Sequence, residues 1–180
     1  MSSEAAGDLS SLIQGAKQGD MDAQDGLIRQ YQKRIAAFLY AMSGRSELVE
    51  DLAQTVFIKM VLALPKLKEA DRFESWLFRL ARNVYLDHYR RERLRRFFVP
   101  FLEEHEQVST PVAPGSERLE GLAVALQELP PNQRELLVLL QEREWSYEEL
   151  AVMTNSTVGA VKSRLFRART ELKRLLPYET

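Results

Sequence analysis

Apolar side chains recur at helical spacing along nearly the whole chain, and this spacing constrains the fold more than any other feature. Apolar residues three and four positions apart share one side of a helix, whereas a half-buried strand requires strict alternation. The helical pattern dominates the 180 residues, and we find no convincing strand segment. The sequence therefore predicts an all-α protein.

The N-terminal part is predicted to contain a shorter helix over residues 9–17 and a long helix over residues 21–42, capped by Asp20. An aspartate before the first helical turn accepts hydrogen bonds from free backbone N–H groups. The next helix begins near Ser46 and ends at Pro65, because proline cannot continue a helix interior. These helices place a packed domain at the start of the chain.

A further helix is predicted to begin at Asp71, with Glu74 as its reciprocal capping partner, and to reach Arg93. Its buried stripe is expected to consist of Phe73, Trp76, Leu77, Leu80, Val84 and Tyr85. Phe78 falls off this stripe. An aromatic ring outside the packing face is a candidate for stacking on unpaired bases.

The helical pattern then stops. Between residues 97 and 121 the chain holds three prolines and five glutamates against one arginine, Arg118. We interpret residues 97–117 as an acidic linker between an N-terminal domain of residues 1–96 and a C-terminal domain of residues 118–180. A tether without a function of its own remains an equal reading, because disorder and charge commonly occur together.

The C-terminal domain has the pattern of a helix-turn-helix. Pro131 fits the first position of a helix, Ser146 and Glu149 form a capping box, and Asn155 suits a left-handed turn. A last helix follows over residues 157–176. A short helix, a tight turn and a longer basic helix are typical of DNA-binding domains.

The charge of the chain is unevenly distributed. The formal net charge is −1, but residues 72–96 and residues 157–176 each carry +5, whereas the first thirty residues carry −3 and residues 97–121 carry −4. Two basic helices, one of them in a helix-turn-helix, favour nucleic acid as a partner. We expect the free protein to bind DNA weakly, because its acidic segments screen the basic helices.

Composition argues against most catalytic chemistry. The chain has no cysteine and only His88 and His105 as imidazoles, and neither histidine has metal-ligand spacing. Its glycines form no phosphate-binding loop. We therefore expect no enzyme activity, no cofactor and no metal. Apolar runs are too short to span a membrane and no secretion signal is found, so a cytoplasmic protein without membrane insertion is predicted.

Three motifs together resemble the extracytoplasmic-function (ECF) group of the sigma-70 family. Residues 49–57 (VEDLAQTVF) are similar to its polymerase-binding helix, and residues 73–91 (FESWLFRLARNVYLDHYRR) to its promoter-melting helix. Residues 146–151 (SYEELA) and 158–169 (VGAVKSRLFRAR) resemble its minus-thirty-five-reading domain. The order and spacing of the segments also match.

The resemblance implies partners and contact residues. Core RNA polymerase would be bound through its largest-subunit coiled coil and its flap, with Asp51, Leu52, Gln54 and Phe57 as polymerase-binding residues. The minus-ten promoter element would be contacted by Leu67, Lys68, Phe78, Arg79, Arg82, Asn83, Asp87 and Arg90. The minus-thirty-five element would be contacted by Tyr147, Glu148, Lys162, Ser163, Arg164, Phe166 and Arg167.

The expected function is that of a dissociable transcription initiation factor, held inactive by an anti-sigma partner. A polymerase-independent helix-turn-helix regulator is the main alternative, but it leaves the segments at residues 49–57 and 73–91 without a task. A nucleic-acid-processing enzyme is a third class, which the lack of clustered metal ligands disfavours. Two roles are open for the Phe166 side chain. It contacts the DNA major groove beside Lys162 and Arg167, or it packs at the edge of the hydrophobic core.

Overall fold

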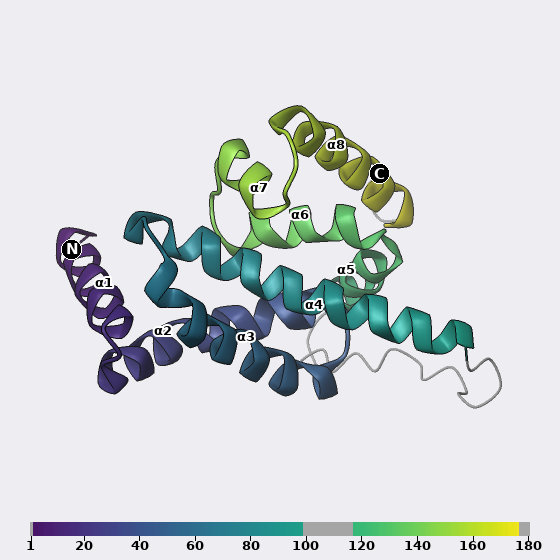
Figure 1. Cartoon of the computed structure of the whole chain (residues 1–180). Helices are drawn as coiled ribbons and strands as arrows, with labels where there is room; N and C mark the ends of the chain where they lie inside the picture. The colour runs from purple at the N-terminus through teal and green to yellow at the C-terminus, as the bar shows by residue number, and fades with distance from the viewer. Residues whose placement is uncertain (1, 99–116, 177–180) are drawn as a thin grey trace.

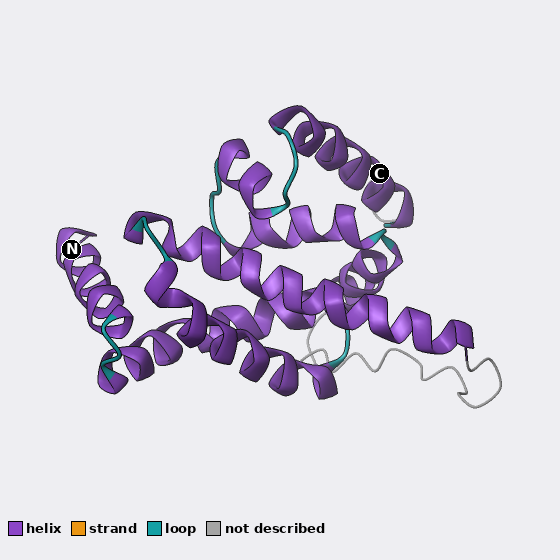
Figure 2. Ribbon diagram, in the orientation of Figure 1, coloured by secondary structure: helices purple, strands orange, loops and turns teal. Residues whose placement is uncertain are grey.

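The structure is a computed structural model that describes residues 2–98 and 117–176, with side chains described within residues 9–95 and 121–176. In these ranges the chain forms helices joined by short turns, without a strand (Figure 2). The all-α prediction is therefore confirmed for the described residues.

The N-terminal half is a bundle of four α-helices: α1 (Ser2–Lys17), α2 (Met21–Ser43), α3 (Val49–Ala63) and α4 (Phe73–Phe98). Three 3-10 turns lie between them: η1 (Ser46–Leu48), η2 (Leu64–Lys66) and η3 (Ala70–Arg72). Asp20 caps α2 as predicted, because its carboxylate accepts from the backbone N–H groups of Asp22 and Ala23.

The start of α4 differs from the prediction. Asp71 lies inside η3 rather than at a cap position, and α4 begins at Phe73. The Glu74 carboxylate does not reach back to the backbone, since it binds Tyr31, Arg34 and Arg143 instead. The predicted capping pair is therefore wrong, because a tertiary ion pair takes the side chain that the local motif would use.

The C-terminal half contains α5 (Glu117–Glu128), α6 (Pro131–Glu142), α7 (Tyr147–Met153) and α8 (Val158–Leu175). The Ser146–Glu149 capping box is present at the start of α7, and Asn155 has the predicted left-handed backbone, with φ of 49°. Thr157 caps α8 by accepting from the N–H of Ala160. The helix-turn-helix prediction is confirmed. Of the predicted linker over residues 97–117, residues 99–116 lie outside the described residues, whereas Phe98 ends α4 and Glu117 begins α5.

The two halves pack against each other. Helix α6 lies on α2, and α7 lies on α4, which crosses the molecule with α3 on its other side (Figure 1). Fully buried side chains run without interruption from Phe38 and Phe78 in the N-terminal half to Leu136 and Leu139 in the C-terminal half. The described residues thus share one continuous hydrophobic core.

A buried arginine joins the ends of helices from both halves. The Arg134 guanidinium, on α6, donates to the carbonyl of Met42 near the end of α2 and to the carbonyls of Gln127 and Leu129 at 2.6 and 3.1 Å, where α5 ends. The last carbonyls of a helix have no intrahelical partner and carry partial negative charge. A cation with several N–H groups satisfies both ends at once.

The end of α2 is shaped for this contact. Gly44 has a positive φ of 68° and returns its N–H to the carbonyl of Tyr40. A Cβ atom at Gly44 would lie 2.8 Å from the side chain of Gln127, which itself donates to the carbonyl of Ala41 at 3.0 Å. Glycine is therefore required here for both backbone conformation and close approach.

A second link between the halves is a carboxylate held by two arginines. Glu74 accepts from Arg34 at 2.7 Å, from Tyr31 at 2.9 Å and from Arg143, which follows α6. Burial alone would raise the pKa of Glu74, but the hydrogen bonds and charge of these partners outweigh it and the pKa is lowered. The ionised carboxylate therefore stabilises the packed structure.

We predict that Arg134→Met lowers the free energy of unfolding by about 3 kcal/mol, because carbonyls at two helix ends would lose a charged donor while staying buried. Urea unfolding followed by circular dichroism measures this change. Arg169→Met, at an exposed position on α8, is the matched control and should change stability by less than about 0.5 kcal/mol. Equal midpoints for the two variants would contradict the capping role.

We predict that Glu74→Gln lowers the free energy of unfolding at pH 7 by about 2 kcal/mol. Since the pKa of Glu74 is lowered in the folded state, its contribution is present above the pKa of the unfolded chain and is lost as the pH falls through the folded pKa. Urea midpoints of the variant and the parent should therefore converge on acidification from pH 7 to below about pH 4. A difference that is independent of pH would contradict an ionic role.

Candidate nucleic-acid and polymerase interfaces

Helix α8 presents a cationic face to solvent. Lys162, Ser163, Phe166 and Arg167 are exposed, and 73% of Phe166 is accessible. The opposite face, with Val161, Leu165 and Ala168, is buried against the rest of the C-terminal half. This exposure rules out the alternative in which Phe166 packs at the edge of the hydrophobic core.

The charges on this face are available to a ligand. Within the described residues, neither Lys162 nor Arg167 forms an ion pair. The Lys162 ammonium lies 5.4 Å from the ring centroid of Tyr147, on α7. Tyr147 and Glu148 are both exposed at the start of α7, whereas Arg164 is half-buried. Lys162, Ser163, Phe166 and Arg167 thus share one exposed face with Tyr147 nearby, whereas Arg164 lies closer to the buried Glu135, and Glu148 lines a cleft with Asp71 and Arg72. Contact of these residues with DNA stays a prediction.

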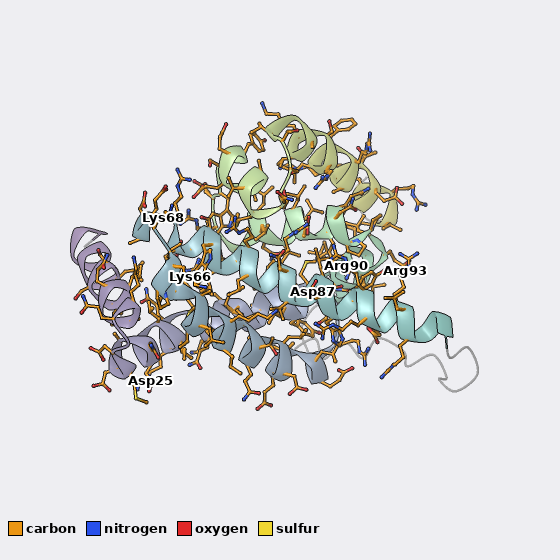
Figure 3. The ribbon with its side chains drawn as sticks, in the orientation of Figure 1. Asp25, Lys66, Lys68, Asp87, Arg90 and Arg93 are labelled. Atoms are coloured by element: carbon orange, nitrogen blue, oxygen red, sulfur yellow. The ribbon has the colours of Figure 1, made fainter. Side chains whose placement is uncertain are left out.

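The predicted minus-ten residues divide into two groups. On α4, Asn83 and Arg90 are exposed and Arg79 and Asp87 are partly exposed. Figure 3 shows Asp87 and Arg90 along the C-terminal part of α4, and Lys68 in the connection that precedes the helix. Lys68 is exposed there, next to the half-buried Leu67, whose carbonyl accepts from Lys17. These residues remain candidates for DNA contact.

Phe78 and Arg82 form the second group, and the structure buries them. The prediction that Phe78 lies off the packing face is wrong, because its ring is 0% exposed between Phe38 and Trp145, with centroids 5.6 and 5.7 Å away. Trp145 comes from the turn between α6 and α7. The stripe read from α4 alone omits this second packing face, because α2 of the same half and Trp145 of the other half together cover it.

Arg82 is bound by a carboxylate that sequence analysis did not single out. Its Nε and a terminal nitrogen donate to the two Glu135 oxygens at 2.6 and 3.2 Å, and Glu135 is 0% exposed. Burial raises the pKa of Glu135, although the hydrogen bond from Arg82 and the positive charge of Arg82 act to lower it. One feature of the sequence could have predicted this ion pair. Arg134 and Glu135 directly precede a leucine-rich run, and charged side chains on the apolar side of a helix need buried partners.

The outer face of α3 combines charge and exposed apolar groups. Of the predicted polymerase-binding residues, Asp51 and Gln54 are exposed, whereas Leu52 and Phe57 are buried and would act by supporting the helix. The side chains of Ile58 and Leu62 are 54% and 72% exposed on the same helix, and sequence analysis did not propose them. Their four-residue spacing outside the packing stripe was the signal that could have found them.

Two negative findings apply to the described residues only. No group of three or more histidine, aspartate or glutamate side chains among them could hold a metal ion. None of the described helices has the length and apolar character needed to cross a membrane.

Comparisons with known proteins match both halves of the chain. Residues 27–95 match the model of sigma-70 region 2, and residues 119–172 match that of sigma-70 region 4. The ECF RNA polymerase sigma factor SigE of Mycolicibacterium smegmatis is 32% identical over 87% of this chain, which spans 62% of the length of SigE. The ECF sigma factor EcfG of Rhodopseudomonas palustris is 30% identical over 79% of this chain and 78% of its own length.

Solved structures show the same arrangement of helices. The sigma factor RpoE of Bartonella quintana, in complex with the anti-sigma factor NepR, has a TM-score of 0.70 and 27% identity. The match covers 87% of this chain and 98% of RpoE. Two family regions in the expected order, on a shared fold, confirm the resemblance read from the sequence. The chain therefore belongs to the ECF group of the sigma-70 family of RNA polymerase sigma factors.

Proposed function

We propose that this chain is a dissociable transcription initiation factor that binds core RNA polymerase and directs it to a promoter with minus-thirty-five and minus-ten elements. It melts the minus-ten region and is released after initiation, without chemistry of its own. The observation that carries the proposal is the presence of region 2 and region 4 on one chain. A polymerase-independent regulator would need only the second of these regions.

The C-terminal half supplies the duplex-reading surface. An α-helix fits the major groove of B-DNA, where arginine and lysine bind guanine edges or phosphates and an apolar ring contacts thymine methyl groups. Lys162, Phe166 and Arg167 on the exposed face of α8 provide this chemistry. Tyr147, at the start of α7, lies next to Lys162.

The N-terminal half supplies the polymerase contact and the melting surface. Asp51 and Gln54 on the outer face of α3 offer polar groups next to the exposed Ile58 and Leu62, a mixture suited to a protein partner. Asn83 and Arg90 on α4 offer polar and cationic groups to single-stranded DNA. Linking both halves through polymerase raises the effective concentration of each on the promoter.

An anti-sigma factor is the expected regulator. RpoE, to which the chain is similar over most of its length, was solved in complex with one. A cognate inhibitor of this chain would bind the surfaces that polymerase uses, and the exposed apolar groups on α3 belong to that surface.

Transcription by reconstituted holoenzyme tests the proposal. The purified chain is added to bacterial core RNA polymerase on a library of promoters with randomised minus-thirty-five and minus-ten elements, and the transcripts are sequenced. A selected two-part motif is expected. Failure to bind core polymerase would refute the proposal, whereas tight binding of the chain alone to a duplex operator would favour a conventional helix-turn-helix regulator.

We predict that Lys162→Ala and Arg167→Ala each weaken binding of holoenzyme to the selected promoter and flatten its salt dependence. Each lost phosphate contact should change the slope of log K against log salt by about 0.9. Lys173→Ala, at an exposed position near the end of α8, is the matched control and should leave the affinity and the salt slope unchanged. Parental affinity and slope in both variants would show that the recognition face lies elsewhere.

We predict that Asp51→Ala weakens binding to core polymerase about tenfold, equivalent to about 1.4 kcal/mol, without a change in thermal stability. Competition against a fluorescently labelled parent chain measures the affinity. Asp25→Ala removes the same charge from an exposed position on α2 and should leave binding unchanged. Equal affinities of the two variants would remove Asp51 from the proposed interface.

A further inference from the structure

The connection between α3 and α4 carries two of the predicted minus-ten residues and has little regular structure of its own. This α3–α4 connection (residues 64–72) consists of η2, three residues without regular structure, and η3. The fully buried Leu64 lies at its start, and the buried Phe73 follows its end. Between them Lys66 and Lys68 are exposed (Figure 3). The place of Lys68 therefore depends on how the backbone of the connection is held.

One hydrogen bond from a distant helix holds that backbone. The Lys17 ammonium, in the last turn of α1, donates to the carbonyl of Leu67 at 2.6 Å, and both side chains are partly buried. In the part of the chain that the structure describes, no other hydrogen bond reaches residues 65–71 from a distant segment. A hydrogen bond from a charged donor is stronger than one between neutral groups. The carbonyl that Lys17 binds directly precedes Lys68.

Helix α1 is packed closely enough to act as a fixed support. Its residues Ile13 and Ala16 are buried in the core, and the helix contacts η2, η3 and α2 (Figure 1). A Cβ atom at Gly15 would lie 3.0 Å from the Cβ atom of Ala23 on α2, so a larger residue would push the two helices apart. The close packing of α1 on α2 thus determines where the Lys17 ammonium lies.

We propose that Lys17 is a positioning residue for minus-ten recognition. Its ammonium fixes the Leu67 carbonyl and thereby the place at which Lys68 meets DNA. Helix α1 lies before residues 27–95, which match sigma-70 region 2, so the support comes from outside the segment that carries the recognition residues. The inference rests on the proposed function, because it takes Leu67 and Lys68 as minus-ten contacts.

Selection by holoenzyme from the promoter library measures the effect on recognition. Lys17→Met keeps an unbranched side chain that packs but removes the charged donor, and should lower the preference for the selected minus-ten element about fivefold. The minus-thirty-five preference should stay parental, because the other half of the chain reads that element. Lys17→Arg, which supplies a charged donor again, should recover most of the minus-ten preference. Lys33→Met, at an exposed position on α2, is the matched control and should change neither preference.

Hydrogen exchange of the free chain separates positioning from direct contact with DNA. The amides of Leu67 and Arg72 donate to carbonyls within the connection itself. Lys17→Met should raise the exchange rates of residues 64–72, measured by mass spectrometry, about fivefold, because local opening becomes easier. Peptides from α8 should keep their parental rates. A lysine that only contacted DNA would leave exchange in the free chain unchanged, and that result would overturn the inference.

A second variant moves Lys17 without removing its charge. Gly15→Ala places a methyl group against Ala23 and forces α1 away from α2, so both readouts should shift in the same direction as in Lys17→Met. Gly121→Ala on α5, where a Cβ atom would meet no atom within 4 Å, is the matched control. Circular dichroism should show parental helix content, and Gly15→Ala decides the question where Lys17→Met fails to fold. Parental minus-ten preference in the folded variants would contradict the positioning role.

Transcription by the parent chain distinguishes failure of this inference from failure of the proposed function. A two-part motif selected by the parent, together with an unchanged minus-ten preference in Lys17→Met, overturns the positioning role and leaves the proposed function standing. Absence of polymerase-dependent transcription by the parent overturns the proposed function instead. The recognition role of the α3–α4 connection then falls with it, even where hydrogen exchange rises.

Discussion

The Arg134 guanidinium satisfies carbonyl groups at the ends of two helices that belong to different halves of the chain. Those carbonyls carry the negative ends of the helix dipoles and are buried, so leaving them without a donor would cost more than bringing one cation into the core. The position of α6 on α2 depends on this contact. The placements of Glu135 on Arg82 and of Trp145 on Phe78 follow from it, because Glu135 adjoins Arg134 and Trp145 follows the same helix.

The same packing explains how a chain with a net charge of −1 can carry two strongly basic helices. Part of the positive charge on α4 is neutralised inside the molecule, where Glu135 binds Arg82. The positive charge of Lys162 and Arg167 on α8 faces solvent instead. The two basic helices thus differ in how much of their charge faces solvent, and this difference comes from tertiary contacts rather than from their equal formal charges.

Local features were predictable because they depend on neighbours in the sequence. The Asp20 cap, the Ser146–Glu149 capping box and the left-handed Asn155 each involve residues within one helical turn. The family also followed from three short segments in order. The Asp71–Glu74 pair has the same local pattern as the Ser146 box, yet it fails, because Arg34 and Arg143 offer Glu74 a stronger charged partner.

The sequence by itself determined the helices, their caps, the order of the two regions and the outward cationic face of α8, because helical periodicity and capping are set by short-range geometry. Only the tertiary structure decided that Phe78 is buried and that Arg82 is paired with Glu135. Periodicity identifies which side chains share a face of one helix. It carries no information on which distant helix covers that face, and here the covering helix α6 brings the carboxylate of Glu135 that pairs with Arg82.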